Sequence, residues 1–494
     1  MLRSIPTAVG GAPRPKADES SVGERMRRAL ETLNPVHIGL LFIVVALAIY
    51  LFSNPTRSGF YNHFVWQADA FLHGRVGISY PVETGPHTNG YFQDVMPLPA
   101  DPGEPTYALL PFPPLPAIVL LPFVALFGLA TDSQLIGVVI GAINVGLAWR
   151  LTTRLTSDRA AGVLATVFFA FGTVHWYAAM LSTTWFLAHV IAITFLLLSI
   201  TLALDGERRE KALERLRQAA RATTSAPTPV AQLFEDSMFL SWFRRLRRHV
   251  DPVQFMAGFV FGVAAIARLS VLFAAPFYLF VGGGGSIWRR GFSAALGAII
   301  PVGLLLAYNV IAVGHLFNPA YEYLYQTEYL GYLPPDLAIN RDFGIEDVRH
   351  VPVNLLIMFL WPPQIAPVAG CVATLLSPTC PLIVPDQIGM SILLTSPAYL
   401  LAIPLVLRNL RERIVLGSVL AIVPVAFLNL MHFSQGWVQF GYRFSNDFAP
   451  FALVLVTLAI ARAHGPWRLL AVALVALSVV INAWGVYWGV TLGW

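Results

Sequence analysis

The chain has 494 residues, of which 56% are hydrophobic and only 12% are charged, and its mean hydropathy is +0.65. A water-soluble protein could not hide so much apolar surface, so the composition excludes a soluble enzyme and predicts an integral membrane protein. The net charge of +5 gathers in connections between apolar runs. Such charge is a topology signal and a contact for membrane lipids, and it does not indicate a nucleic-acid partner.

Apolar runs follow one another along the whole chain, and most are long enough to cross a hydrocarbon core of about 30 Å. They predict an all-α integral membrane protein, a bundle of roughly 11–13 transmembrane helices joined by two larger extracytoplasmic loops. The runs lie at residues 38–52, 109–127, 135–151, 161–178, 185–204, 255–272, 292–313, 391–407, 414–430, 448–461 and 469–487, with shorter, broken or half-spanning runs at 273–281 and 353–361.

Arg and Lys residues in short connections stay on the cytoplasmic side of a membrane, which sets the expected orientation. The tail 1–36, predicted to be disordered, and the basic connection 205–250 are therefore expected inside. Loops 54–108 and 314–389 hold four Arg against twelve Asp and Glu and are expected outside. They separate an N-terminal transmembrane module, residues 37–313, from C-terminal transmembrane helices, residues 390–494.

The helix count and the charges disagree at one place. Four apolar runs lie between the first outside loop and residue 205, and four crossings would leave the basic connection 205–250 outside. Either one run is not a full span or the connection violates the charge rule. We give the charges more weight and expect an incomplete span.

The two cysteines, Cys371 and Cys380, both fall in loop 314–389. Nine residues apart in an oxidising compartment, they are predicted to form a disulfide that closes a small loop. No HExxH, P-loop or dinucleotide-binding motif occurs, so the sequence names no certain cofactor and leaves a divalent metal open.

Acidic residues in loop 54–108 are candidates for catalysis because this loop carries them to the membrane surface. Apolar residues within 60–75 recur at helical spacing, which predicts an amphipathic helix on the outer leaflet with Tyr61, His63 and Asp69 at its rim. Asp94 precedes the segment that returns to the membrane. Either Asp69 or Asp94 could serve as a general base, and either could instead be a solvated or paired carboxylate.

Two arginines are candidates for substrate binding. Arg268 interrupts an apolar run, where a charge is costly unless it is functional or paired. Arg443 follows Tyr442 in an aromatic segment expected outside, where its alternative role is an ion pair with Asp447. A planar guanidinium can bind phosphate oxygens through two hydrogen bonds at once.

Four segments resemble the GT-C superfamily of polytopic glycosyltransferases, which includes protein mannosyltransferases and aminoarabinose transferases. They are YNxxVxxADAFLxGR at Tyr61–Arg75, Asp94 followed by PFPPLP at Pro111–Pro116, LLLAYNVIAVGHLFNPAYEY at Leu304–Tyr323, and QFGYRFSNDFAPF at Gln439–Phe451. The resemblance covers the chain loosely.

The resemblance implies an enzyme of the bacterial plasma membrane that moves a sugar, with inversion, from a polyprenyl-phosphate carrier to a glycan, lipid or protein acceptor on the extracytoplasmic face. It implies that a carboxylate of the first loop is the base. Besides the two arginines, we take Tyr61, His63 and Tyr442 as candidates for contact with substrate. Many members carry an acidic residue at the start of the first-loop helix, where this chain has Tyr61-Asn62-His63. The base is therefore expected at Asp69 or Asp94.

Two other classes of function stay open. A transporter or flippase for a lipid-linked sugar or another amphiphile would also explain Arg268 within an apolar run. A structural partner in an envelope complex would leave the loop carboxylates without a role.

Overall fold

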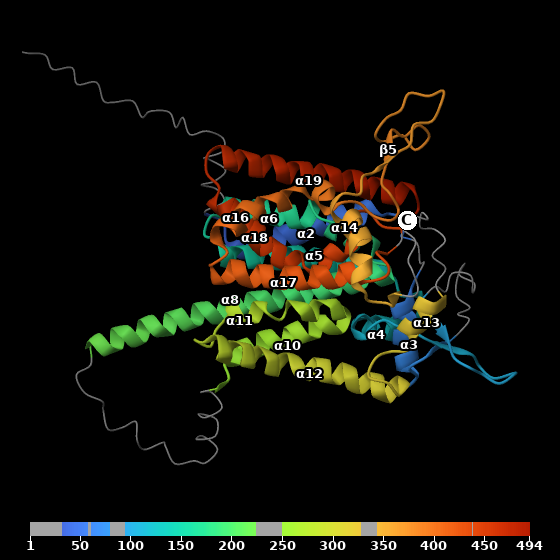
Figure 1. The fold of residues 1–494 in the computed structure, drawn as a ribbon, viewed down its shortest axis with the longest axis horizontal. Coiled ribbons are helices and arrows are strands. Elements are labelled where there is room, and N and C mark those ends of the chain that lie inside the picture. Colours follow the sequence, from blue (N-terminus) through green and yellow to red (C-terminus); the bar gives the residue numbers. More distant parts are fainter. Residues whose placement is uncertain (1–31, 58–60, 80–93, 224–248, 328–342, 437) are drawn as a thin grey trace, which may run out of the picture.

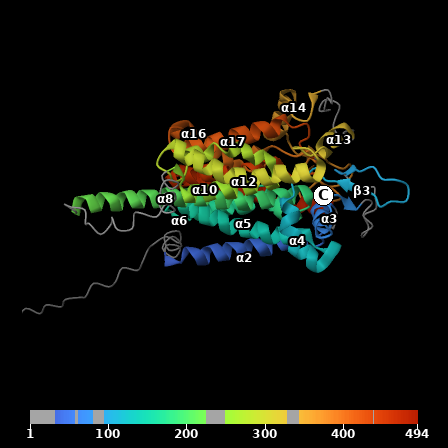
Figure 2. The ribbon, with the colours of Figure 1, turned by 90° about the horizontal axis from the view of Figure 1, so that it is seen from below.

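The computed structural model describes residues 32–57, 61–79, 94–223, 249–327, 343–436 and 438–494. Its helices run roughly parallel to one long axis and form a bundle with two different ends (Figures 1 and 2). The loop end carries helices α3 (His63–Leu72) and α13 (Ala320–Thr327). At the opposite end, α8 (Thr184–Thr223) runs out of the bundle.

Among the described residues, six helices are long and apolar enough to cross a membrane: α2 (Pro35–Ser53), α5 (Ser133–Leu155), α8, α12 (Ile287–Val313), α17 (Arg413–Met431) and α19 (Pro466–Thr491). A pair bent by 49°, α6 (Arg159–Phe171) and α7 (His175–Leu181), makes a seventh if it is one span. The expected fold, an all-α integral membrane protein, is confirmed for the part of the chain that the structure describes.

The remaining apolar segments are shorter or broken. The expected number of 11–13 transmembrane helices counted apolar runs, and several of these runs form short helices or pairs of short helices. They are α4 (Leu115–Phe127) with η2 (Gly128–Ala130), α10 (Pro252–Ala267), η4 (Leu269–Ala274) with α11 (Phe277–Phe280), η7 (Val348–His350) with α14 (Val351–Phe359), α15 (Ile392–Thr395), η8 (Pro397–Leu401), α16 (Ala402–Asn409), and η9 (Arg443–Asp447) with α18 (Ala449–Arg462).

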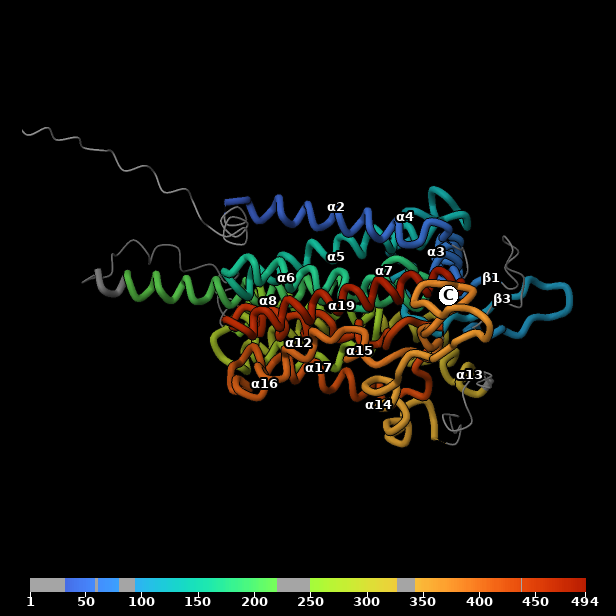
Figure 3. The backbone as a smooth tube through the Cα atoms, turned by 90° about the horizontal axis from the view of Figure 1, so that it is seen from above, coloured from blue at the N-terminus to red at the C-terminus, as the bar shows by residue number. Residues whose placement is uncertain are grey.

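Helix α4 fits the incomplete span that the charges favour. Both of its flanks lie at the loop end: Phe112 packs against His63, with ring centroids 5.8 Å apart, and Asp132 accepts a hydrogen bond from Arg57 at 3.1 Å. Its 13 residues are too few for a hydrocarbon core of about 30 Å. Three crossings then remain before residue 205, namely α5, the α6–α7 pair and α8. Residues 205–223 therefore lie at the end opposite loop 54–108 (Figure 3).

The basic connection expected at 205–250 begins as helix. Residues 205–223 prolong α8, whose 40 residues are more than a hydrocarbon core needs (Figure 1). Residues 211–219 of this extension are exposed. The cluster at Arg244–Arg248 lies outside the described residues, as do residues 1–31 of the predicted disordered tail.

Helices α10 and α12 approach closely because small residues line their interface. A Cβ built on Gly258 would lie 2.0 Å from the carbonyl oxygen of Ala294, and one built on Gly297 would lie 2.0 Å from that of Phe255. No side chain fits at either glycine. Helix α10 ends at Ala267, and Arg268 is the capping residue that follows it.

The loop end holds two small antiparallel sheets. Strands β1 (Ile78–Ser79) and β2 (Met96–Pro97) both pair with β3 (Tyr107–Leu109), with Ile78 opposite Ala108 and Met96 opposite Leu109. Strand β4 (Gln364–Ile365) pairs with β5 (Ile383–Val384). The helix expected near residues 60–75 forms as α3, but it does not lie open on a leaflet. Seven of its ten residues are buried, and it packs against α4 because both helices are largely apolar.

Cys371 and Cys380 are joined by a disulfide in the loop between β4 and β5. We expect protein purified without reductant and alkylated before digestion to give a cross-linked peptide that contains both residues. Mass spectrometry with and without reduction measures this. Two alkylated cysteines in the unreduced sample would show that the thiols are free.

Candidate active site

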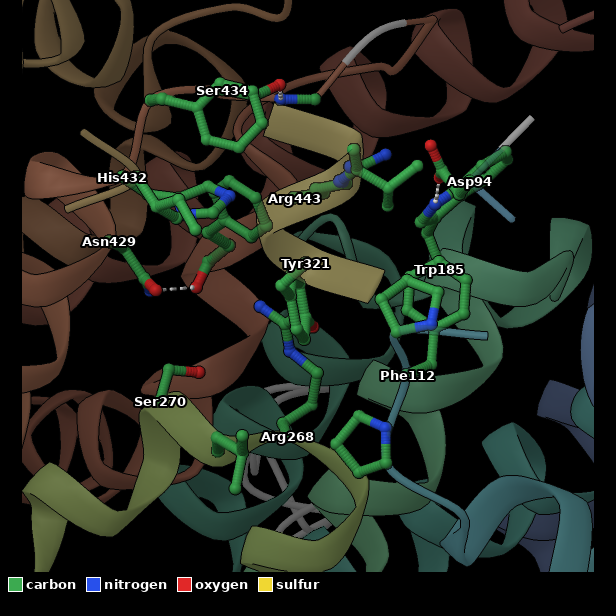
Figure 4. A pocket seen from close by; sticks show the side chains of 18 of the residues that line it. Asp94, Phe112, Trp185, Arg268, Ser270, Tyr321, Asn429, His432, Ser434 and Arg443 are labelled. Atoms are coloured by element: carbon green, nitrogen blue, oxygen red, sulfur yellow. Dashed lines mark hydrogen bonds between the residues drawn. The ribbon is translucent and has the colours of Figure 1, made fainter. Parts of the chain in front are cut away.

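A cavity of about 1080 Å³ opens at the loop end of the bundle. Its wall combines segments far apart in the sequence: the first loop, the start of α8, the junction of α10 with η4, helix α13, and the connection from α17 to α18 (Figure 4). The polar side chains among its lining residues include Asp94, Arg268, Glu346, His432 and Arg443.

Asp94 lies beside the indole of Trp185, whose Nε1 donates a hydrogen bond of 2.7 Å to Asp94 Oδ2. Burial raises the pKa of Asp94, and the Trp185 hydrogen bond and the charge of Arg443 offset only part of this increase. A carboxylate with a raised pKa is a stronger base than an exposed one. Asp94 also has a φ of 58°, a left-handed conformation uncommon for a residue other than glycine.

Arg443 lies on the same wall, with its guanidinium carbon 5.9 Å from the ring centroid of Trp185, 5.7 Å from that of Phe186 and 5.3 Å from that of Phe444. Gly436 makes room for it, since a Cβ there would lie 2.4 Å from Arg443 Cζ. Aromatic faces attract a cation, so these three rings help to hold the guanidinium at the cavity wall. Trp185 thus contacts both Asp94 and Arg443.

Arg268 is held by Asp447, which is fully buried in the connection before α18. Arg268 Nε donates to Asp447 Oδ1 at 3.1 Å and Nη2 to Oδ2 at 2.9 Å. Ser270 Oγ and Asn429 Nδ2 donate to Oδ2 at 2.6 and 3.3 Å, and His189 Nδ1 lies 2.7 Å from Oδ1.

These contacts decide the charge of Asp447. Burial alone would raise its pKa, but the charge of Arg268 and the hydrogen bonds from its partners lower the pKa well below the usual range. The result is a carboxylate that holds a cation at the cavity wall, where 22% of the Arg268 side chain stays exposed. The ion pair considered from the sequence, Arg443 with Asp447, is not the one formed, because Asp447 pairs with Arg268.

A second acidic side chain, that of Glu346, also lines the cavity. Glu346 Oε1 is 2.8 Å from His432 Nδ1, and both residues line the cavity together with Tyr321. Sequence reasoning missed Trp185, Tyr321, Glu346 and His432. Trp185 carried a signal as an aromatic residue at the outer start of an apolar run, and Tyr321 lies in the quoted segment Leu304–Tyr323.

The two predicted catalytic carboxylates are separated by the fold. Asp94 lines the cavity, whereas Asp69 is not among the lining residues and instead lies 3.6 Å from His73 Nδ1 and 3.8 Å from Arg75 Nη2. Both partners are nearby in sequence, so local charge pairing accounts for Asp69.

The other predicted residues divide in a similar way. Tyr61 lines the cavity, and its ring packs against that of Trp185 at 4.8 Å. His63 is buried behind it, with Nδ1 2.8 Å from Thr184 Oγ1. Tyr442 is fully buried and packs against Phe444, at 5.9 Å between centroids, without lining the cavity. In the described part of the chain, no three His, Cys, Asp or Glu residues are grouped so as to hold a metal ion.

No protein-family model matches this chain, and no curated protein matches it. Two solved structures of the Archaeoglobus fulgidus oligosaccharyltransferase are similar in fold. The apo form has 11% sequence identity and a TM-score of 0.42 over 92% of this chain and 56% of that one. The form tethered to an acceptor peptide with the NVT sequon has 13% identity and a TM-score of 0.39, over 92% and 55%.

The chain thus spans about half the length of the structures that it resembles. Fold and cavity together define a polytopic membrane protein with a carboxylate and two arginines at one end of its helical bundle.

Proposed function

We propose that this protein is a membrane glycosyltransferase that moves a sugar from a polyprenyl-phosphate carrier to an acceptor on the extracytoplasmic face. One observation carries the proposal: Asp94, Arg268 and Arg443 line the same cavity, although they come from three distant parts of the sequence. Glycosyl transfer from a lipid phosphate needs one base and positive charge for the leaving group, and this cavity offers both.

In the proposed reaction, Asp94 takes the proton of an acceptor hydroxyl as its oxygen attacks the anomeric carbon of the sugar. The bond from that carbon to the phosphate oxygen breaks, and the configuration of the carbon inverts. The polyprenyl phosphate leaves with the bonding electron pair, and Arg268 and Arg443 stabilise its added negative charge. In this proposal the base comes from the first loop and the two cations come from the end of α10 and from η9.

The apolar lining of the cavity suits the lipid part of such a donor. Leu269, Leu305 and Phe317 line it beside the two arginines, and the side chains of Leu269 and Phe317 are exposed at the surface of the bundle. A polyprenyl chain could pass over these residues into the bilayer while its phosphate stays at the arginines.

The extracytoplasmic placement rests on charge, since the loops at this end are acidic and the connections at the other end are basic. The bacterial plasma membrane is proposed on the sequence resemblance. The acceptor is a glycan, a lipid or a protein. The similar oligosaccharyltransferase was solved with an acceptor peptide, which makes peptides one class to test.

Purified protein in liposomes, supplied with a panel of polyprenyl-phosphate sugars, tests the function. A transferase forms a new glycosidic bond and releases polyprenyl phosphate, both of which mass spectrometry detects. A transporter or flippase would move the intact labelled lipid to the other leaflet and form no new bond. Movement without transfer would contradict the proposal.

Phosphate binding makes a separate prediction for the two arginines. Arg443→Lys and Arg268→Lys should each weaken the binding of undecaprenyl phosphate about tenfold, and Ala variants about 10–100-fold, because charged hydrogen bonds contribute about 1.5–3 kcal/mol. Lys keeps the charge but loses the paired N–H groups. Calorimetric titration in detergent measures the affinity.

Arg462→Ala is the matched control, since Arg462 forms a bidentate ion pair with Glu412 at the opposite end of the bundle. Its affinity for undecaprenyl phosphate should equal that of the wild type. Unchanged affinity in both cavity Ala variants would show that neither arginine holds the phosphate.

A further inference from the structure

The disulfide closes a hairpin that carries no charge. Between His350 and Asp386 the sequence holds no Asp, Glu, Lys or Arg. We call residues 362–385, which include β4, β5 and the Cys371–Cys380 disulfide, the apolar hairpin. An extracytoplasmic loop that faces only water has no reason to exclude charge over this length, so the composition indicates an apolar environment.

Large apolar side chains of the hairpin are exposed in the structure. Ile365 is 78% exposed, Val372 is 86% exposed and Leu376 is 56% exposed, and Val368, Leu375 and Leu382 are exposed as well. Contiguous exposed apolar surface of this kind is costly in water and marks contact with a membrane or a partner. Its exposed residues surround the disulfide, so the covalent link gives this surface a fixed shape.

The hairpin is attached to a helix that faces lipid. Trp484 Nε1 and Trp488 Nε1 of α19 donate to the carbonyl oxygen of Leu375 at 3.3 and 3.0 Å, and Tyr487 Oη donates to that of Leu376 at 2.6 Å. Trp and Tyr are the residues that gather at the membrane–water boundary. Towards its other end, α19 exposes a stripe of apolar residues to the bilayer: Leu469, Leu470, Val472, Leu477 and Val480.

The direction in which the hairpin projects distinguishes it from the other loops. It leaves the bundle sideways beyond α19, whereas the turn between β2 and β3 extends along the long axis, away from the membrane (Figures 1 and 3). That turn carries Asp101 and Glu104, both exposed. A charged loop thus points towards water, and an uncharged loop lies beside the bundle at the height of the α19 aromatic residues.

We propose that the apolar hairpin rests in the membrane boundary at the loop end, with Val372, Leu375 and Leu376 in contact with lipid. Its occupant is the bilayer, because the hairpin continues the lipid-facing surface of α19 through hydrogen bonds from three boundary aromatic residues. This placement does not depend on the reaction that the cavity catalyses.

The full chain in lipid nanodiscs tests this placement. The nanodiscs contain a phospholipid with a photoreactive diazirine high on its acyl chain, and adducts are mapped by peptide mass spectrometry after irradiation. We expect adducts on the peptide around Val372–Leu376, as on the lipid-facing stripe of α19. The double variant Val372→Asp with Leu376→Asp should lower the hairpin adducts at least about tenfold, because carboxylates leave the acyl region.

Three controls decide the result. The α19 stripe must be labelled equally in both proteins, and the acidic turn at Asp101–Glu104 must stay unlabelled. The backbone oxygens that α19 binds are unchanged in the double variant, so an intact Cys371–Cys380 peptide confirms the hairpin's shape. An unlabelled hairpin beside a labelled α19 would overturn the proposal, as would hairpin cross-links to a second copy of the chain in place of lipid.

Discussion

Asp94→Asn should lower the rate of sugar transfer by about 10²–10⁴-fold, the contribution typical of a general base. The amide keeps the shape of the side chain and can still accept the hydrogen bond from Trp185, so undecaprenyl phosphate should bind as it does to the wild type. Transfer rates in liposomes and donor affinity in detergent are measured on the same preparation. A loss of rate with unchanged affinity identifies a base.

Asp69→Asn is the matched control, because Asp69 lies on the same loop but pairs with His73 and Arg75 outside the cavity. It should transfer sugar at nearly the wild-type rate. Full activity in Asp94→Asn would remove Asp94 from the mechanism, and loss of activity in Asp69→Asn alone would transfer the role to Asp69.

The pH profile adds an independent readout of the same carboxylate. The base works only when ionised, so activity falls as the pH drops through the pKa of Asp94. Because burial raises this pKa, the acid limb of the kcat/KM profile should lie above the value of about 3.9 typical of Asp. Trp185→Phe removes a hydrogen bond that lowers the pKa, so the limb should move to still higher pH.

Asp447→Ala should destabilise the protein by about 3–5 kcal/mol, the cost of breaking a buried ion pair. The variant leaves Arg268 with its charge at the cavity wall and removes the shared acceptor of Ser270, His189 and Asn429. Without this carboxylate, Arg268 is no longer held in place, so donor affinity should also fall. Thermal unfolding and the titration with undecaprenyl phosphate measure the two effects.

Glu412→Ala supplies the comparison for this loss. Glu412 and Arg462 form an ion pair through two hydrogen bonds of 2.7 and 2.8 Å, but their side chains are 39% and 41% exposed. An exposed pair contributes about 0–1 kcal/mol, so this variant should unfold close to the wild type. Equal unfolding temperatures for Asp447→Ala and Glu412→Ala would contradict the anchoring role of Asp447.

Charge and residue spacing in the sequence predicted several features that the structure contains. The basic residues of 205–250 favoured an incomplete span among four apolar runs, and α4 is too short to be a full one. The short separation of Cys371 and Cys380 suggested the disulfide, because two thiols joined by so short a loop can meet whatever the rest of the fold does. Both kinds of prediction need only a short stretch of sequence. The hydropathy of a run predicts whether it can span the bilayer, and the basic residues of a connection predict the side on which it lies.

Other outcomes needed the folded chain. Helical spacing predicted α3, but its burial against α4 depends on which helix lies next to it. The same limit left Asp69 and Asp94 equivalent, because a sequence does not show which carboxylate faces a cavity. What distinguishes Asp94 from Asp69 is its place in the cavity wall, where it accepts a hydrogen bond from Trp185, 91 residues further along the chain.

By itself, the sequence determined a polytopic helical membrane protein, its acidic loops and basic connections, and an arginine within an apolar run, where lipid would make an unpaired charge costly. Tertiary structure alone decided that Asp447 pairs with Arg268, 179 residues away, and with His189, 258 residues away. The hydropathy and charge of a segment determine whether that segment lies in lipid or in water, whatever the rest of the chain does. A buried ion pair instead depends on side chains that only packing brings within hydrogen-bond distance.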